Sequence, residues 1–278
     1  MSAVNISAAD IKKLREMTGA GMMDCKKALT EAEGDFDQAI EILRKKGQKV
    51  SAKRADNEAK EGVVIALVND DKRRGVVVKL SSETDFVAKN EEFIEGTKAI
   101  AEAALAHFPD SLEALLDTKV EDGRTVRELY EDLLAKFTEK MELSYEHLEA
   151  PVVAPYIHMG YKAGVLVGLS EAGNDVYDAG RDVAMQVAAM RPIAVNKDEV
   201  DQAVIEKEIE IGKEQARQEG KPEQILEKIA QGKLGKFFKE NTLLNQQFVK
   251  DNKQTVADYL KSVQNGLTVT AFRHVELG

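Results

Sequence analysis

The chain has few of the residues that build disulfide frameworks, aromatic pockets or membrane spans. Among its 278 residues there is one cysteine, Cys25, and there is no tryptophan. A single cysteine excludes an internal disulfide and favours a reducing, cytoplasmic setting. Aromatic residues make up only 5% of the chain, which argues against a large aromatic-lined ligand cavity. No apolar run reaches about 18 residues, so the sequence predicts no transmembrane helix and no contact with a membrane.

Motifs that bind nucleotides, hold metals or carry nucleophilic catalysis are also missing. The nearest approach to a phosphate-binding loop, residues 168–173, is followed by Asn174 rather than by lysine. The histidines are scattered without metal-ligand spacing, and no serine stands in a G-x-S-x-G elbow. Cys25 lies on the apolar side of a predicted helix, which favours a small buried side chain over a nucleophile. The sequence therefore predicts no cofactor, no metal, no direct nucleotide binding and no enzyme activity.

The charge of the chain is acidic and unevenly distributed. The net charge is −10 at pH 7, whereas residues 1–55 carry 11 Lys and Arg against 8 Asp and Glu. Proteins that grip RNA or DNA are usually basic over at least one face. A basic N-terminal segment followed by an acidic remainder instead favours docking to a protein, or weak contact with a ribosome.

Three short helices are predicted near the N-terminus. Ser7 has the character of a helix cap at the start of the first, and Gly34 ends the second. Asp35 caps the third, which we expect to end at Gly47 because glycine commonly follows the last turn of a helix. Residues 48–61 are polar and charged without an apolar face, and this pattern is typical of a linker.

The central part of the chain alternates strand-like and helical patterns, which predicts an α+β fold. Valine-rich runs at 62–68 and 74–80, separated by a turn cluster, predict a β-hairpin, and strand texture returns at 151–169. Helical patterns follow these strands, over residues 93–105, 125–141 and 182–190. Because both parts place a hairpin before a helix, we suspect that one α+β unit has been duplicated.

A projecting helical hairpin is predicted at residues 198–231. Each of its two helices has one apolar face among charged residues, and residues 220–222 break the chain between them. The hairpin either dimerises or touches a partner, or it is a solvated projection; we favour an interaction role. A helix around Leu260 and a closing strand over residues 267–277 complete the chain.

Residues 81–90 follow a predicted strand and precede a predicted helix, a place where proteins often present functional residues. On the residues alone, the favoured interpretation is a capped helix start with Phe86 turned into the core. The alternative is an exposed carboxylate, Asp85, beside an aromatic wedge, Phe86, that enters a cation site of a partner. A third interpretation pairs Glu83 with Asp85 in an enzyme, but neighbouring side chains of an extended segment diverge and rarely meet one substrate atom.

Several stretches match, in order, the signatures of one known family. They are Gly-Ala-Gly-Met-Met-Asp-Cys-Lys-Lys-Ala-Leu at 19–29, Glu-Thr-Asp-Phe-Val-Ala-Lys-Asn at 83–90, Asp-Val-Ala-Met-Gln-Val-Ala-Ala at 182–189, and the segments 229–236 and 247–250. With them the chain resembles the bacterial elongation factor Ts family essentially from end to end. The resemblance implies a ubiquitin-associated-like three-helix domain at 1–54 and a two-part α+β core with small sheets, divided into an N-terminal subdomain at 55–145 and a C-terminal one at 146–278. The second subdomain would contain the coiled-coil hairpin, at about 198–231, and the C-terminal helix and strand.

The resemblance also implies a function. Members of this family are guanine-nucleotide exchange factors that bind the GDP form of the GTPase elongation factor Tu in translation elongation and promote GDP release. A Thr-Asp-Phe-Val segment enters the region around the magnesium of the GTPase, and that role falls on Thr84, Asp85, Phe86 and Val87. Other family contacts fall on Lys12, Arg15, Met22 and Met23 in the first domain and on Ala163, Gly164, Gln186 and Val187 in the core. Core filling is an equally good interpretation of the two methionines, and a homodimer through the core or the hairpin stays open.

One position departs from the family pattern. The third signature usually carries histidine where this chain has Gln186. An amide donates and accepts hydrogen bonds but cannot become cationic, so this position cannot supply an imidazolium.

Overall fold

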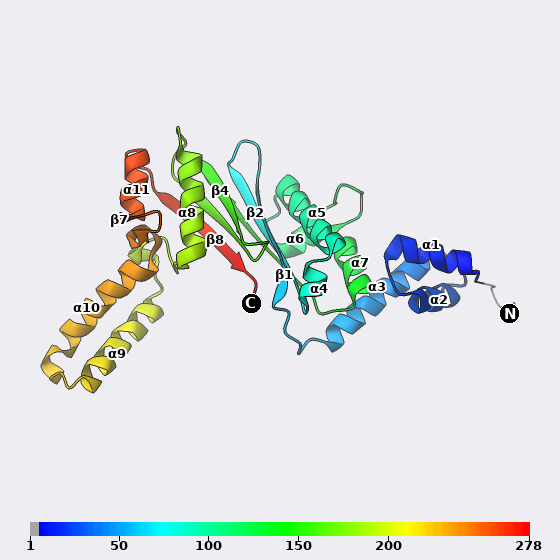
Figure 1. Ribbon diagram of the computed structural model, residues 1–278, viewed down its shortest axis with the longest axis horizontal. Coiled ribbons are helices and arrows are strands. Elements are labelled where there is room, and N and C mark those ends of the chain that lie inside the picture. Colours follow the sequence, from blue (N-terminus) through cyan, green and yellow to red (C-terminus); the bar gives the residue numbers. More distant parts are fainter. Residues whose placement is uncertain (1–5) are drawn as a thin grey trace.

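The computed structural model describes residues 6–278 and shows an elongated α+β molecule. A helical N-terminal domain, a central pair of small antiparallel sheets with their helices, and a projecting helical hairpin follow one another along its length (Figure 1). Within the described residues, no helix is both long enough and apolar enough to cross a membrane.

The N-terminal domain consists of three helices around a small core. They are α1 (Ala8–Thr18), α2 (Met22–Glu31) and α3 (Phe36–Lys53). Ser7 and Asp10 cap α1 reciprocally, and the Asp35 side chain caps α3, as the sequence predicted. Cys25 is fully buried between the helices together with Leu14 and Leu29, which confirms its interpretation as a small core residue.

The prediction that α3 ends at Gly47 is wrong, because the helix continues to Lys53. Gly47 faces α7 (Val126–Phe137), and a Cβ placed on it would lie 2.6 Å from the backbone nitrogen of Ala135. The glycine is therefore required for the close approach of two helices rather than for ending one. Beside this contact the Arg44 Nε donates to Asp132 Oδ1 at 2.6 Å, so α3 docks the helical domain onto the core.

The first sheet and its helices form one core. The strands are β1 (Glu61–Val68), β2 (Arg74–Ser82) and β3 (Glu142–Glu149), paired antiparallel in that order. The helices are α4 (Asp85–Ala88), α5 (Glu91–His107), α6 (Leu112–Leu116) and α7. Phe93, Ile100 and Leu80 are fully buried between sheet and helices. Strand β3 was not predicted: the helix was expected to reach Met141 but ends at Phe137, and three glutamates interrupt the apolar pattern of the strand.

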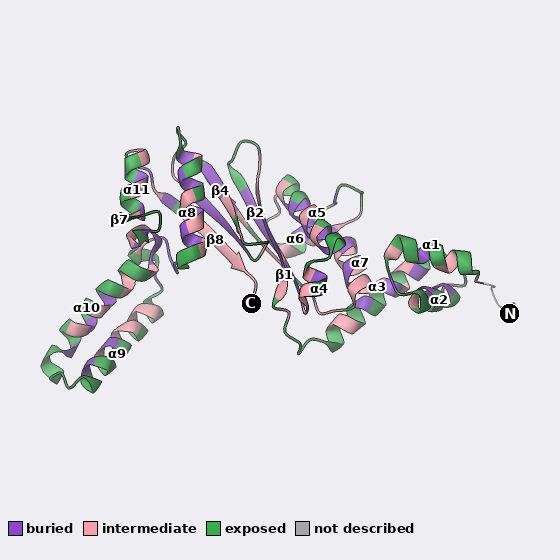
Figure 2. Cartoon of the chain, in the orientation of Figure 1, coloured by how far each residue is buried: buried purple, intermediate pink, exposed green. Residues whose placement is uncertain are grey.

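The second sheet repeats this topology. Its strands are β4 (Val152–His158), β5 (Ala163–Leu169) and β8 (Val269–Glu276), again antiparallel in that order. Helix α8 (Val176–Met190) begins six residues before the expected start and covers one face of the sheet. In both sheets a hairpin and a helix are followed by a third strand that pairs with the second, as the suspected duplication requires. The two sheets pack through Val64, Val77 and Leu166, and Figure 2 shows the buried residues gathered in the strands and on the inner sides of their helices.

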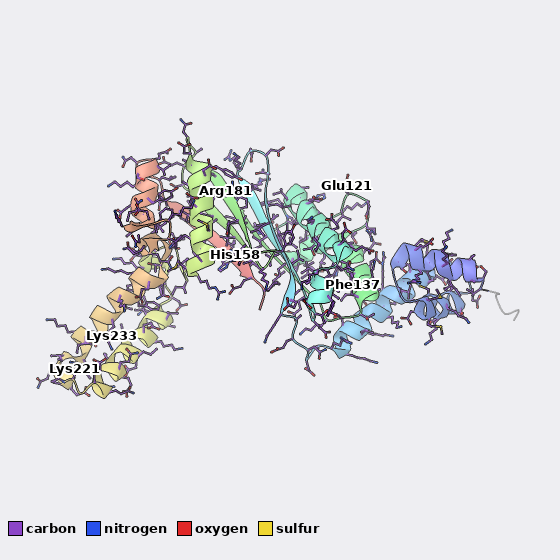
Figure 3. All side chains as sticks on the ribbon, viewed as in Figure 1. Glu121, Phe137, His158, Arg181, Lys221 and Lys233 are labelled. Carbon is purple, nitrogen blue, oxygen red and sulfur yellow. The ribbon has the colours of Figure 1, made fainter. Side chains whose placement is uncertain are left out.

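The projecting hairpin is longer than predicted, because its second helix continues beyond residue 231. It consists of α9 (Gln202–Gln218) and α10 (Glu223–Asn241), joined at a turn where Gly220 has a φ of +73°. Lys221 lies at the tip, and Lys233 on α10 donates to Gln215 on α9 (Figure 3). A short turn η1 (Lys197–Glu199) precedes the hairpin, and η2 (Leu243–Asn245), β6 (Gln247–Phe248), β7 (Asp251–Thr255) and α11 (Val256–Val263) lead from it to β8.

Candidate functional site

The connection between β2 and α5 presents one large apolar side chain to solvent. Thr84 caps the four-residue helix α4, its Oγ1 accepting a hydrogen bond from the Val87 backbone nitrogen at 3.4 Å. Phe86 is 85% exposed, the most exposed large apolar side chain in residues 6–278, whereas Val87 is only 8% exposed and packs into the first core. The capped helix start is therefore confirmed, but the expectation that Phe86 turns into the core is wrong, because Val87 occupies that position.

An ionised carboxylate stands beside the exposed ring. Asp85 accepts a hydrogen bond from the Lys89 ammonium, one turn further along, at 2.6 Å. This hydrogen bond and the positive charge of Lys89 hold the pKa of Asp85 below its ordinary value. The Lys89 side chain is 77% exposed and that of Asp85 is 48% exposed, so water and salt weaken their attraction. The turn thus offers an aromatic ring and a negative charge side by side.

A carboxylate distant in sequence holds this turn. Oε2 of Glu139 accepts hydrogen bonds from the backbone nitrogens of Glu83 at 3.0 Å and Thr84 at 3.1 Å, and its Oε1 accepts one from the Thr84 hydroxyl at 2.7 Å. Glu139 lies just beyond the end of α7, 55 residues from Thr84. Sequence reasoning missed it, since no local pattern around residue 139 indicates which backbone it contacts.

Glu83 ties the same turn to the linker that follows the helical domain. Its Oε1 accepts from the Lys140 backbone nitrogen at 2.6 Å, and its Oε2 accepts from Arg54 Nη1 at 2.9 Å and Asn57 Nδ2 at 2.8 Å. Burial raises the pKa of Glu83, but these hydrogen bonds together outweigh burial and leave the pKa below its ordinary value. Glu83 and Asp85 both have lowered pKa values and separate partners, whereas a general acid needs a raised one. The arrangement therefore speaks against a catalytic carboxylate pair.

The lowered pKa of Glu83 predicts an acid-dependent loss of stability. A carboxyl whose pKa is lower in the folded chain contributes its full stability above the unfolded value, ordinarily 4.5, and loses it as pH falls through the folded value. We expect Glu83→Gln to lower the free energy of unfolding by about 1–2 kcal/mol at pH 7, and by less at pH 3.5, because the hydrogen bonds to a charged group are lost. Thermal unfolding of both proteins between pH 3 and 7 measures this, and a gap that stays constant over the range would contradict it.

The family contacts expected in the helical domain lie on its surface. Lys12 and Arg15 are exposed on α1, with Lys12 loosely paired to Glu16 at 3.7 Å. Met22 and Met23, in the first turn of α2, are 55% and 64% exposed. Core filling is therefore the wrong interpretation of these methionines, and both sulfur-bearing side chains are accessible to a partner.

The residues expected to contact a partner from the core are instead buried in the chain. Ala163 and Gly164 lie in β5, where a Cβ on Gly164 would stand 2.9 Å from Val64 Cγ1, and Val187 lies on the buried face of α8. Gln186 is also fully buried: its Nε2 donates to Gln246 Oε1 and to the Gln247 carbonyl, both at 3.1 Å. Its Oε1 accepts from the backbone nitrogen of Val249 at 2.8 Å.

Gln186 thus acts as a support for the segment after η2 rather than as a surface group. Both of its hydrogen-bonding capacities are used, which a neutral amide can satisfy without becoming charged. The Val249 side chain, which this segment carries, is 44% exposed. Gln186 itself is 0% exposed and does not reach the surface.

The family model and three individual relatives that match this chain all carry the same name. Residues 83–278 match the family model described as elongation factor TS. The chain is 54% identical over 274 residues to the elongation factor Ts of Christiangramia forsetii, covering 98% of this chain and 99% of the relative. It is 55% identical over 275 residues to the elongation factor Ts of Amoebophilus asiaticus, with the same coverage. It is 47% identical over 273 residues to that of Porphyromonas gingivalis, covering 98% of each.

Proposed function

The chain belongs to the elongation factor Ts family and has a role in translation elongation, and from this premise we propose that it promotes the release of GDP from the GTPase elongation factor Tu. In this proposal it binds the GDP form as a non-enzymatic factor, and residues 84–87 disturb the Mg²⁺ and phosphate site. The observation that carries the proposal is the firmly held turn with an exposed Phe86 and an ionised Asp85.

The proposed mechanism needs only a modest free energy. A GTPase holds GDP largely through its phosphates and a bridging Mg²⁺. A factor that binds the empty GTPase better than the GDP form weakens GDP binding by the same ratio, because binding linkage is reciprocal. A hundredfold effect requires about 3 kcal/mol of differential contact. One phenylalanine that becomes buried supplies roughly 1.5–3 kcal/mol, and a carboxylate near the Mg²⁺ site adds to it.

We propose that exposed groups of the helical domain contact the same partner. Lys12 and Arg15 offer positive charge, and Met22 and Met23 offer adaptable apolar contact, on a surface separate from the turn. We propose that this surface docks the GTPase while the turn acts on its nucleotide site. The buried Ala163, Gly164, Gln186 and Val187 contribute by shaping the core surface.

Release of a fluorescent GDP analogue from purified elongation factor Tu tests the proposed function. The measurement uses excess unlabelled GDP and catalytic amounts of this protein. Acceleration at a substoichiometric dose is the expected result. Binding without acceleration would instead favour an interaction scaffold, in which residues 84–87 are only a capped turn.

The hairpin is proposed to add an interaction surface, either for the GTPase or for a second copy of the chain. Its helices bury Ala216, Leu226 and Ala230 and are joined by charged pairs such as Lys213 with Glu227. Residues 202–241 belong to none of the four hydrophobic clusters of the described chain. Replacing 206–236 by a short Gly-Ser linker, which joins the helices at facing positions, should leave the rest folded.

We expect this replacement to weaken complex formation with elongation factor Tu, or self-association, by about tenfold, since about 1.4 kcal/mol of contact is lost. Isothermal titration and analytical ultracentrifugation measure the two effects. If affinity and stoichiometry both stay at the wild-type values, the hairpin is a solvated projection.

A further inference from the structure

We infer that Glu139 is a positioning residue for exchange: its carboxylate holds the turn of Asp85 and Phe86 in the conformation that the partner meets. The inference rests on the proposed function, because it concerns how the turn becomes effective in nucleotide release. Glu139 itself is half-buried behind the turn and is not proposed to touch the GTPase or the nucleotide.

The hydrogen bonds of Glu139 determine how the turn is capped. A carboxylate only accepts, so the Thr84 hydroxyl at 2.7 Å must donate its proton to Glu139 Oε1. The oxygen of that hydroxyl then keeps its lone pairs for the Val87 backbone nitrogen, the hydrogen bond that closes α4. Glu139 therefore acts on the residues flanking Phe86 from both sides: through two backbone nitrogens before it and through the cap after it.

The two segments hold each other reciprocally. Glu139 accepts from the backbone of Glu83, while Glu83 accepts from the backbone of Lys140. Lys140 in turn donates its ammonium to the carbonyls of Ala55 and Asn57 in the linker, at 2.8 and 3.0 Å. On the other side, Thr138 ends α7 in a left-handed conformation with its backbone nitrogen bonded to Leu134. Glu139 is thus itself fixed between two anchored neighbours.

A turn as short as α4 needs such external ties. A helix of four residues cannot stabilise itself, because nucleation fixes several dihedral angles for one hydrogen bond. Without Glu139 the turn would sample other conformations, and ordering it would oppose the action of Phe86 on the nucleotide site. In the proposed function the helical domain, and not the turn, docks the GTPase. The affinity of docking should therefore be preserved when Glu139 is replaced.

The test compares Glu139→Ala and Glu139→Gln with wild type and with Glu121→Ala. Glu121 lies exposed on the loop before α7, so its replacement makes the same charge change away from the turn (Figure 3). For each protein, release of fluorescent GDP from elongation factor Tu is measured against factor concentration, which separates the maximal rate from the half-saturating concentration. Amide hydrogen exchange of Glu83 and Thr84 reports the turn directly, with Ile100 in α5 as the internal reference.

We expect Glu139→Ala to lower the maximal release rate by about tenfold, with the half-saturating concentration nearly unchanged and the two amides exchanging faster. Glu139→Gln keeps one accepting oxygen and should fall between Glu139→Ala and wild type. A maximal rate at the wild-type level, or unchanged exchange of both amides, would overturn the inference. If Glu139→Ala does not fold, a wild-type maximal rate for Glu139→Gln overturns it. Absence of any acceleration by wild type overturns the proposed function itself, and is distinguished in this way.

Discussion

Phe86→Ala is expected to lower the maximal rate of GDP release from elongation factor Tu by between about tenfold and a hundredfold, because burial of one phenylalanine supplies about 1.5–3 kcal/mol. The stability of the free chain should barely change, since an exposed side chain that packs against nothing contributes within about 0.5 kcal/mol. Phe86 is that kind of residue, with 85% of its surface in solvent. Stopped-flow release of a fluorescent GDP analogue and thermal unfolding of the same preparations check the two parts.

Its chain neighbours provide matched controls. Val87→Ala removes buried methyl groups and should lower the free energy of unfolding by about 1–2 kcal/mol, the opposite pattern to Phe86→Ala. Phe86→Leu retains apolar bulk without the ring and should give an intermediate rate. Asp85→Ala should also slow release without affecting folding. If Phe86→Ala and Asp85→Ala both fold normally and release GDP at the wild-type rate, the wedge hypothesis fails.

Gly47→Ala should undock the helical domain from the core. The added Cβ would stand 2.6 Å from the Ala135 backbone nitrogen and 2.7 Å from its Cα, and no side-chain rotation relieves a contact with backbone. Helices α3 and α7 must therefore separate. Overpacking of this kind typically costs about 1–3 kcal/mol, offset by up to about 1 kcal/mol from the better helix propensity of alanine. Calorimetry should show an earlier first transition, and protease should cut the linker at 54–60 faster.

Gly232 in α10 offers a matched helical glycine. Nothing lies within 4 Å of the position its Cβ would take, so Gly232→Ala should stabilise the hairpin by up to about 1 kcal/mol. The two substitutions make the same chemical change and should have opposite signs. A stabilising effect of Gly47→Ala would mean that α3 does not approach α7 as closely as the geometry requires.

The sequence predicted those features that depend on neighbouring residues. Ser7 and Asp35 cap their helices as expected, because a cap contacts backbone only a few residues away. Gly47 was misinterpreted because the sequence alone does not distinguish a glycine that ends a helix from a glycine that allows a second helix to pack closely. Strand β3 was missed because its partner β2 lies far earlier in the chain, with Ser81 paired to Glu142 and Arg74 to Glu149. Its three glutamates also interrupt the apolar pattern.

In the candidate site, too, local features were predictable and contacts between distant residues were not. The helix start at 84–87 was predicted from the sequence, but which of its two apolar residues faces the core depends on a short turn. Glu139, 55 residues from Thr84, accepts three hydrogen bonds from that turn. No pattern in the local sequence indicates such a contact, and only the folded chain brings the carboxylate to the turn.

Because the two sheets have the same topology, the same connection can be compared in both. Each copy leads from its second strand into its helix through a connection at the same place in the fold. In the first copy this connection carries Phe86 on a braced turn, whereas in the second it is residues 170–175, Ser-Glu-Ala-Gly-Asn-Asp, without a large apolar side chain. The two equivalent units therefore carry different additions. The first presents Phe86 on the connection after its second strand, and the second carries the projecting hairpin of α9 and α10.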